Sequence, residues 1–491
     1  MHHNPLGPVM TTSSGTPVAD NQHSLTVGAH GPLLWQDWPL MEKLAAFNRE
    51  RIPERVVHAK GWGAWGTFTA TKDLSQFCRA SVFSAVGKKT PVLARFSTAL
   101  GESGAADAER DLRGFAVKFF TDEGNWDMVG SNSPVFFIRD PMKFPDLVHS
   151  QKRNPHDHLR SNTAYWDFLS LCPESMHQIT FLMGERGLPA SPRFMNGYGG
   201  HTFSIWNVRG ERFWVKFHFK SQQGHKTLTN AQACALVGED RESCQRDLYG
   251  AIEAGQYPRW TVSIQWMPEQ DAMAARANLF DATKVWPQGD HPLIEIGELE
   301  LNRNPQNYFA EVEQAAFSPA NVVPGIGFSP DRILQGRLLA YADAQRHRIG
   351  THYNALPVNA PRCPVAHGHQ DGAMRFFDNV SNPAAYYEPN SFGGPTANAA
   401  FREPPWVVDR LVDRHAPIDG QEDHAQVCAL FRRMSERQRQ ALASNIAHSM
   451  KGVPVFIVDR ALANFDAVTL AYGNAVRAAL QVCGVAYTPT I

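Results

Sequence analysis

The chain has 491 residues, of which 43% are hydrophobic, 19% charged and 11% aromatic. This length and composition can form one large core or several, and they exclude a chain that is disordered throughout. The 47 basic and 48 acidic residues nearly cancel, which argues against nucleic acid or an anionic membrane as a partner. No apolar run is long enough to span a membrane and no secretory signal pattern is present, so we expect a soluble, cytoplasmic protein.

The first two thirds of the chain predict an extended arm followed by many strands. Residues 1–34 are rich in Ser, Thr, Gly, Pro and His, and a short helix is expected near residues 40–48. From Gly66 to about Met267, the expected strands are GTFTAT, TPVLARFST, RGFAVKFFT, SPVFFIRD, HTFSIWNV, RFWVKFHFK and WTVSIQW. Arg209 and Gly210 suit a hairpin connection. So many strands without regularly interleaved helices favour an antiparallel barrel or sandwich.

The last third predicts a wrapping segment and then helices. Residues from about 300 to 420 are rich in Pro, Asn and Gly and contain one clear helix. Ser329 is the candidate N-cap of that helix, Pro330 suits its first turn, and Gly350 ends it. The final 70 residues predict helices, with Ser435 and Gln438 spaced as a capping box.

Two residues on the long helix suggest chemistry. Arg337 and Tyr341 are four positions apart, so their side chains share one helical face. A guanidinium beside a phenol stabilises the phenolate, which is a hard anionic ligand suited to ferric iron. Taken alone, such a pair is more often an ordinary surface contact, and a single histidine such as His58 is more often a core residue than a catalyst.

A series of short sequence motifs decides whether these residues are functional or merely structural. In order along the chain they are FNRERIPERVVHAKG, LARFST, RGFAVKF, NWDMVGSNSPVFFIRD, HSQKRNP, NGYGGHTF, DATKVWP, LNRNPQNYFAEVEQAAF and RILQGRLLAYADAQRHRIG. Together they resemble the monofunctional haem catalases of the small-subunit type, from about Leu25 to the C-terminal helices. The resemblance implies an α+β catalase fold, with an N-terminal arm (1–55), a β-barrel haem domain (56–300), a wrapping segment with the proximal helix (301–420) and a C-terminal helical domain (421–491). It also implies a homotetramer.

The resemblance assigns roles to individual residues. On the distal side it implies His58 as the catalytic histidine, Ser97 as its hydrogen-bond partner and Ser131 at the position of an amide. On the proximal side it implies Tyr341 as the iron ligand, supported by Arg337, His201 and Asp331. The remaining haem contacts are expected from Arg55, Arg95 and Arg348 at the propionates and from Phe144 against the ring, with Phe136 and Phe137 flanking the peroxide route.

The implied reaction is the dismutation of hydrogen peroxide to water and dioxygen, which protects a cell against oxidative stress. A neutral imidazole at His58 can accept a proton from one peroxide oxygen and return it to the other. The cofactor is expected to be ferric haem, most simply haem b, with the phenolate of Tyr341 as its ligand. Gln345 and Ala342 depart from the family pattern after this tyrosine and leave the haem variant and its orientation open.

The main departure from the family lies at position 131, where the family carries an asparagine. Asn132 follows immediately, but adjacent strand residues point to opposite faces, so it cannot replace the missing amide without a bulge. A serine hydroxyl can still hydrogen-bond peroxide, although its reach is shorter. We therefore expect retained catalase activity that this substitution can lower.

A bound NADPH is a further expectation from the resemblance. The matching positions of the family's nucleotide site are His177, Arg186, Asn196, Lys220, Trp286 and Gln426, whereas Gly184, Gln288 and Leu430 depart from it. His218 and Lys220 alternate on one strand, so the alternative interpretation is that they are simply surface polar groups.

Two other functions compete with a catalase. One is a peroxidase of the same fold that acts on organic hydroperoxides, which the Ser131 change suggests. The other is a haem-binding relative without turnover. The intact set of His58, Ser97, Arg337 and Tyr341 disfavours both.

Overall fold

The computed structural model describes residues 7–274, 278–376, 385–406, 412–415 and 422–488. The chain divides into two compact units, Met1–Glu54 and Arg55–Ile491. The first unit contains helix α1 (Trp38–Asn48), which Asp37 caps by accepting a hydrogen bond from the Leu40 N–H at 3.3 Å. This helix confirms the expectation for residues 40–48. The finer division of the chain into four parts stays a prediction.

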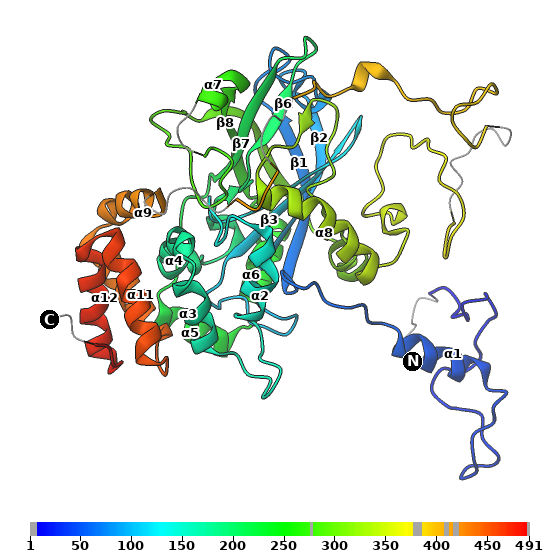
Figure 1. Ribbon diagram of the computed structural model, residues 1–491. Helices are drawn as coiled ribbons and strands as arrows, with labels where there is room; N and C mark the ends of the chain where they lie inside the picture. The colour runs from blue at the N-terminus through cyan, green and yellow to red at the C-terminus, as the bar shows by residue number, and fades with distance from the viewer. Residues whose placement is uncertain (1–6, 275–277, 377–384, 407–411, 416–421, 489–491) are drawn as a thin grey trace. The chain divides into compact units, whose positions relative to one another are not determined.

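The second unit is built around a closed antiparallel barrel (Figure 1). In the described residues, eight strands follow one another around it in the order β7, β5, β4, β3, β2, β1, β9 and β8, and β8 pairs with β7 to close the ring. Short strands β6 and β10 extend from β7. The strands are β1 (Gly61–Ala70), β2 (Lys89–Thr98), β3 (Arg113–Thr121), β4 (Gly124–Ser131), β5 (Gly197–Tyr198), β6 (Phe203–Trp206), β7 (Arg212–Ser221), β8 (Arg259–Pro268), β9 (Ile294–Arg303) and β10 (Ile326–Gly327). The predicted antiparallel barrel is therefore confirmed.

Alternation of side chains along the strands fills the barrel. On β3, Phe115, Val117 and Phe119 are fully buried in the barrel core, while the alternate residues Gly114 and Ala116 face outward. The period of two is what a barrel needs to place aromatic residues inside and leave a second, outer surface. That outer surface of β1 to β4 carries the candidate site.

The predicted strand SPVFFIRD is wrong. Residues 133–140 are irregular, and the strand lies just before them as β4. The Ser131 side chain bonds to Ser133 at this point, and Pro134 has no N–H to donate to a neighbouring strand. Hydrophobicity alone did not separate this buried loop from a strand.

Helices that the sequence did not predict lie within the strand region. They connect β4 to β5 and β7 to β8 over lengths that short turns cannot span. They are α2 (Phe144–His149), α3 (Asn162–Ser170), α4 (Met176–Met183), α5 (Asn230–Glu239) and α6 (Ser243–Glu253), and α7 (Glu269–Ala274) follows β8.

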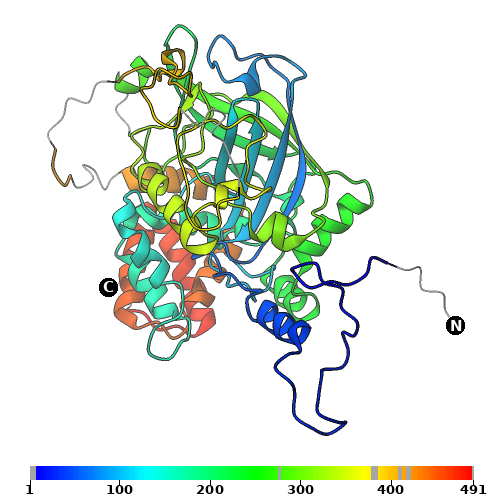
Figure 2. The ribbon, with the colours of Figure 1, turned by 90° about the vertical axis from the view of Figure 1, so that its right-hand side faces the viewer.

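A second core lies beside the barrel, between α3, α4 and the C-terminal helices (Figure 2). These helices are α9 (Glu422–Arg433), α10 (Glu436–Ser449), α11 (Val455–Val468) and α12 (Leu470–Cys483). Phe431 and Tyr472 stack at its centre with ring centroids 4.5 Å apart. The predicted capping box of Ser435 and Gln438 is confirmed at the start of α10.

The long helix α8 (Arg332–Arg348) packs on the barrel through Leu334 and Leu338. Its N-cap is Asp331, which accepts a hydrogen bond from the Leu334 N–H at 3.1 Å, and not the predicted Ser329. The Ser329 hydroxyl donates to the Thr202 carbonyl instead, because it lies two residues too early and is buried against the loop before β6. In the described part of the chain, no helix is both long and apolar enough to cross a membrane.

Candidate active site

One row of three residues crosses the outer face of the barrel. Ser97 on β2 pairs with Gly114 on β3, and Gly114 pairs with Ser131 on β4. Directly paired residues point to the same face of a sheet, so residues 97 and 131 flank the glycine. A Cβ added to Gly114 would lie 2.3 Å from Ser97 Oγ and 2.8 Å from His58 Nδ1. Glycine is therefore required for His58 to lie on this row.

His58 is held by both its backbone and its ring. Its φ is +66°, in the left-handed region that costs a non-glycine residue about 1–2 kcal/mol, and its carbonyl accepts a hydrogen bond from Arg95 Nη1 at 2.9 Å. The ring Nδ1 lies 3.0 Å from Ser97 Oγ. Burial, followed by the charges of Arg95, Arg337 and Arg55, lowers the pKa of His58 to about 3. The imidazole is therefore neutral near pH 7, as a proton acceptor must be.

The Ser131 hydroxyl is engaged locally. It donates to the Ser133 carbonyl at 3.0 Å, across a turn that ends β4. Asn132 points elsewhere, since its Oδ1 accepts from the Arg113 N–H and its Nδ2 donates to the Arg186 carbonyl, each at 2.9 Å. The expectation that Asn132 cannot replace an amide at position 131 agrees with these bonds.

A hydrogen-bonded chain reaches Tyr341 on α8. Arg337 Nη2 donates to the Tyr341 hydroxyl oxygen at 2.7 Å, and Arg337 Nη1 donates to His201 Nε2 at 2.6 Å. His201 Nδ1 lies 2.7 Å from Asp331 Oδ2. Because arginine can only donate, Nε2 of His201 must accept and Nδ1 must carry the proton that bonds to the Asp331 carboxylate. The sequence prediction brought these four residues together correctly.

The charge states of this chain follow from its surroundings. Burial lowers the pKa of His201, which keeps its ring neutral. Burial alone would raise the pKa of Asp331, but His201 and the Leu334 N–H outweigh it and hold the pKa below its usual value. Asp331 is thus a carboxylate, and the chain presents a guanidinium to the oxygen of Tyr341.

Tyr341 and His58 belong to neighbouring rows of the same barrel face. Ala116 and Val129 pack in one hydrophobic cluster with Tyr341, and the Val129 carbonyl accepts a hydrogen bond from Arg337 at 3.0 Å. Gly114 and Ser131, in the His58 row, lie two residues away along the same strands. Two residues of strand span about 7 Å, which is the separation that a flat group needs between its upper and lower contacts.

Three buried arginines converge beside these rows. Arg55 and Arg348 both donate to the carbonyls of Glu313 and Ala315, and Arg95 lies close enough to lower the pKa of each. Burial is the larger cause, and together they lower the pKa of Arg348 to about 10. Among the described residues, one carboxylate, that of Glu313, pairs with them, at 3.3 Å from Arg55 and 3.6 Å from Arg348. Three cations with one anion leave room for two further carboxylates, which fits the two propionates of haem.

Phe144 begins α2 and is linked to a small group of aromatic rings through Phe136. It stacks on Phe136 with ring centroids 6.4 Å apart, and Phe136 meets Phe137 edge to face. All three rings belong to the second core or pack against it. These contacts group the residues expected to flank the peroxide route, whereas a contact of Phe144 with haem stays a prediction.

The residues of the expected nucleotide site gather around Tyr198. Arg186 Nη1 donates to the Tyr198 hydroxyl at 3.0 Å, and Lys220 Nζ lies 5.3 Å from the ring centroid. His218 is 6% exposed, so the interpretation of His218 as a surface group is wrong. Together with Trp286, Tyr198 and Lys216, it lines a cavity of about 20 Å³.

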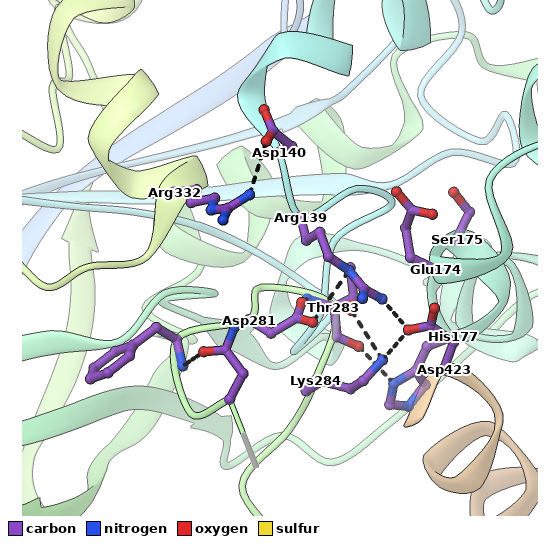
Figure 3. Close-up of polar contacts among 12 residues, drawn as sticks. Arg139, Asp140, Glu174, Ser175, His177, Asp281, Thr283, Lys284, Arg332 and Asp423 are labelled. Carbon is purple, nitrogen blue, oxygen red and sulfur yellow. Dashed lines mark hydrogen bonds and ion pairs between the residues drawn. The ribbon is translucent and has the colours of Figure 1, made fainter. Parts of the chain in front are cut away.

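His177 lies beside Thr283 (Figure 3). Its Nδ1 donates to the Thr283 carbonyl at 3.1 Å, and its ring stacks on Phe181, which also lies 4.8 Å from the Arg186 guanidinium. Gln426 on α9 bonds both the N–H and the carbonyl of Val285, at 2.9 and 3.0 Å. The sequence-predicted nucleotide residues thus lie in one connected group, in which His177, Asn196 and Trp286 are buried.

Sequence reasoning did not single out Gly114, Glu313, Tyr198 or Lys216. Gly114 gains its role from strand register, and Glu313 gains its role from an ion pair with Arg55, which lies more than 200 residues earlier in the chain. The sequence carries no local signal for either. Lys216 shared a signal with His218 and Lys220, because the three residues alternate on one strand.

Comparisons with known proteins agree with this geometry. The family model described as Catalase matches residues 11–394, and the model described as Catalase-related immune-responsive matches residues 417–480. The chain belongs to the catalase family. The catalase of an Onchocerca volvulus endobacterium is 54% identical over 474 residues, covering 96% of this chain and 98% of that protein. Catalase A of Pseudomonas putida is 53% identical over 478 residues, covering 97% and 99%.

Solved catalase structures share the fold. A bacterial catalase superposes with a TM-score of 0.92 at 42% identity, covering 98% of this chain and 97% of that chain. Catalase A from Saccharomyces cerevisiae gives a TM-score of 0.92 at 41% identity, covering 96% and 99%. The predicted catalase fold and small-subunit type are confirmed, and the chain is an enzyme that decomposes hydrogen peroxide. Catalase membership implies haem, and no finding favours the organic-hydroperoxide or non-catalytic alternatives.

Proposed function

We propose that this catalase uses His58 as its proton-transferring residue and Tyr341 as its iron ligand, on opposite sides of one haem. The observation that carries the proposal is the pair of neighbouring rows on one barrel face, with a neutral histidine on one row and an arginine-bonded tyrosine on the other. Among the described residues, Glu313 is the one carboxylate that pairs with the three arginines. The two remaining positive charges match the two propionates of haem, and haem b is the expected form. When bound, the haem supplies the iron that exchanges electrons with peroxide.

The chain's own groups move and hold protons. His58 Nε2, the ring nitrogen not bonded to Ser97, takes a proton from one peroxide oxygen and returns it to the other as the O–O bond breaks. The low pKa of His58 makes this return favourable. Arg337 donates a hydrogen bond to the Tyr341 oxygen and so holds this side chain in place. Phe136 and Phe137 limit the approach of larger reductants.

An oxygen electrode tests the proposal. With hydrogen peroxide alone, the purified enzyme should release one dioxygen for every two peroxides consumed. His58→Gln should retain haem but lose about 10²–10⁴-fold in rate, the usual contribution of a general acid–base group. Tyr341→Phe should fold but fail to retain haem, as followed by the haem absorption band. An undiminished rate in His58→Gln, or peroxide loss only with an added reductant, would contradict these assignments.

We also infer that the surface around Tyr198 binds NADPH. Arg186 and Lys220 provide positive charge for a phosphate, and Trp286, His218 and Tyr198 line a neighbouring cavity. Fluorescence titration of the purified enzyme should show NADPH binding that Lys220→Met weakens several-fold. If neither bound nor added nucleotide is detected, the inference fails.

Assembly and location complete the proposal. We propose a cytoplasmic homotetramer that protects its cell against oxidative stress. In support of an assembly, Trp35 and Trp38 of the first unit are 87% and 61% exposed, and α1 buries none of its side chains. Analytical ultracentrifugation should give four times the chain mass, and a strain lacking the enzyme should be hypersensitive to peroxide.

A further inference from the structure

Trp65 is a nearly buried tryptophan on the outer face of β1, and its ring N–H is bonded to a carboxylate. Its Nε1 donates to Glu311 Oε2 at 2.5 Å, and the residue is 8% exposed. Among the described residues, the other indole N–H groups that bond to the protein donate to a serine or to backbone carbonyls. A carboxylate at hydrogen-bond distance can accept the indole proton as well as bind it.

Two guanidinium groups flank the same ring. The guanidinium carbon of Arg303 lies 4.8 Å from the Trp65 ring centroid, and that of Arg362 lies 5.9 Å from it. Phe120 stacks on Trp65 with ring centroids 5.7 Å apart. An aromatic ring attracts cations through its negative face, whereas a positively charged, oxidised ring would repel them. Trp65 can therefore lose an electron only if its proton leaves as well, and Glu311 is placed to take that proton.

Trp65 lies beside the candidate active site. It belongs to the hydrophobic cluster against which Tyr341 packs. Its partner Glu311 is part of the short helix Phe309–Glu313, and the last residue of that helix pairs with Arg55. Both the ring and its proton acceptor are therefore joined to groups that are expected to hold the haem.

The catalase reaction itself supplies an oxidant. One peroxide is reduced to water and a second is oxidised to dioxygen, so between these two events the enzyme holds two oxidising equivalents. When peroxide is scarce, the second event is delayed and another electron donor can take its place. Negatively charged donors are favoured near Trp65, because the Arg303 side chain is 50% exposed and Arg362 is also exposed.

We propose that Trp65 is an electron-transfer residue that gives this catalase a peroxidase activity toward small anionic ene-diols. The indole gives one electron to the peroxide-oxidised enzyme, and its proton moves from Nε1 to Glu311 Oε2, so an N–H bond breaks and an O–H bond forms. The donor anion then loses one hydrogen atom. Its electron returns to the indole, the Glu311 proton returns to Nε1, and the donor proton goes to the water being formed.

Two such cycles convert one hydrogen peroxide and two donor anions into two waters and two donor radicals. The protein is then unchanged, because Trp65 and Glu311 have each regained their original protonation state. The proposal rests on the catalase reaction and not on the roles proposed for His58 and Tyr341, so it can fail while those assignments hold.

Electron paramagnetic resonance of the haem-loaded enzyme tests the first step. Peroxyacetic acid oxidises the enzyme without serving as the second peroxide, so rapidly frozen samples should contain a tryptophan radical. Incorporation of ring-deuterated tryptophan should narrow its signal, and deuterated tyrosine should not. Trp65→Phe should lose the signal, whereas Trp35→Phe, at a tryptophan that is 87% exposed, is the control and should keep it.

Three results of this experiment would overturn the proposal. They are the absence of any radical in the unmodified enzyme, a signal that responds only to tyrosine labelling, and a tryptophan signal that persists in Trp65→Phe. If Trp65→Phe does not retain haem, the labelling of the unmodified enzyme and the Glu311 variant below still decide the matter.

Glu311→Gln separates proton acceptance from hydrogen bonding. The amide oxygen of glutamine still accepts the Trp65 N–H bond but does not take up the proton, so the radical yield should fall several-fold while the haem absorption band is unchanged. Glu298→Gln is the matched control on β9, because Glu298 bonds to Gln222 and pairs with Arg259 instead. Equal radical yields in Glu311→Gln and the unmodified enzyme would overturn the proposal.

The oxidation of ascorbate, an anionic ene-diol, tests the activity. With hydrogen peroxide generated slowly in the assay, the unmodified enzyme should oxidise ascorbate and Trp65→Phe should lose this activity. Arg362→Gln should lower the ascorbate rate several-fold but leave the rate with neutral hydroquinone unchanged. Ascorbate oxidation that persists in Trp65→Phe, or an equal loss with both donors in Arg362→Gln, would contradict the proposed route and its donor class.

Discussion

At the scale of single residues, the site places positive charge where the protein alone cannot neutralise it. Arg55 and Arg348 share the carboxylate of Glu313, and burial, followed by the charge of the nearby Arg95, lowers the pKa of both. The pKa of Arg95 is lowered chiefly by burial. Such a cluster lowers the stability of the haem-free protein and provides binding energy for an anionic group. Removing one arginine should therefore change the stability of the haem-free protein and its affinity for haem in opposite directions.

Arg348→Met should stabilise the haem-free protein and weaken its hold on haem. The carbonyls of Glu313 and Ala315 still receive hydrogen bonds from Arg55, so the substitution leaves them bonded. We expect a gain of about 1 kcal/mol in unfolding free energy without haem, measured in urea, and faster loss of haem to an acceptor protein. Arg348→Lys keeps the charge and serves as the control. A less stable haem-free Arg348→Met protein would contradict the argument.

Ser131 should give a lower turnover rate than asparagine would at this position, although its own hydroxyl takes no direct part in the reaction. Its hydroxyl bonds to the Ser133 carbonyl, so Ser131→Ala should keep the turnover rate of the unmodified enzyme and lose about 1 kcal/mol of stability. Ser131→Asn places a longer amide on the face that Gly114 and Ser97 share, and we expect up to about tenfold faster oxygen release, which corresponds to about 1.4 kcal/mol. An unchanged rate in Ser131→Asn would show that position 131 does not matter.

At the scale of elements, helix α9 is fastened to the loop that carries Val285 and Trp286. Lys284 Nζ donates to Asp423 Oδ1 at 2.6 Å, and Arg139 bonds to the same carboxylate (Figure 3). One turn later, Gln426 bonds the backbone of Val285. The C-terminal helices therefore hold one wall of the proposed nucleotide site.

Asp423→Asn should destabilise the enzyme strongly. It leaves Arg139 and Lys284, both 12% exposed, with one carboxylate in place of two, and losing one partner of a buried ion pair costs about 3–5 kcal/mol. The urea midpoint should fall by the equivalent amount, and NADPH affinity should fall with it. Glu436→Gln, on the first turn of α10 and away from such a network, should change stability by no more than about 0.5 kcal/mol. Equal midpoints for the two variants would refute a role for this network.

At the scale of the whole molecule, buried neutral histidines couple stability to pH. Burial lowers the pKa of His58 and His218 to about 3 and that of His177 to about 4. The unfolded chain binds these protons near pH 6.5, so between about pH 6.5 and 4 it holds more protons than the folded chain. Stability should therefore be constant above about pH 6.5 and decrease as the pH falls below it.

Urea midpoints at pH 7.5, 6 and 5 measure this dependence. His218→Gln can keep the bond to Gln265 and should flatten the decrease, because one fewer proton is taken up on unfolding. Asp107 and Asp111, whose pKa burial raises, act in the opposite direction and are the same in both proteins. The same pH dependence in His218→Gln would contradict the assignment.

Several parts of this fold and site could be predicted from local sequence. Alternating strands from Gly66 onward indicated an antiparallel barrel or sandwich, and the spacing of Arg337 and Tyr341 indicated a shared helical face. The strand prediction fails at residues 133–140 because buried loops and strands have the same hydrophobicity. The prediction of Ser329 as the cap fails because a sequence does not show that its hydroxyl is bonded to Thr202.

The sequence by itself determined the catalase family and the barrel, because these depend on local patterns and on sequence motifs. The tertiary structure alone decided how the side chains of the candidate site meet. Strand register places Ser97, Gly114 and Ser131 in one row, and the fold brings His201 within 2.7 Å of Asp331, 130 residues further along the chain. Burial then sets which of these groups carry charge, since charge states depend on solvent and neighbours that a linear sequence does not specify.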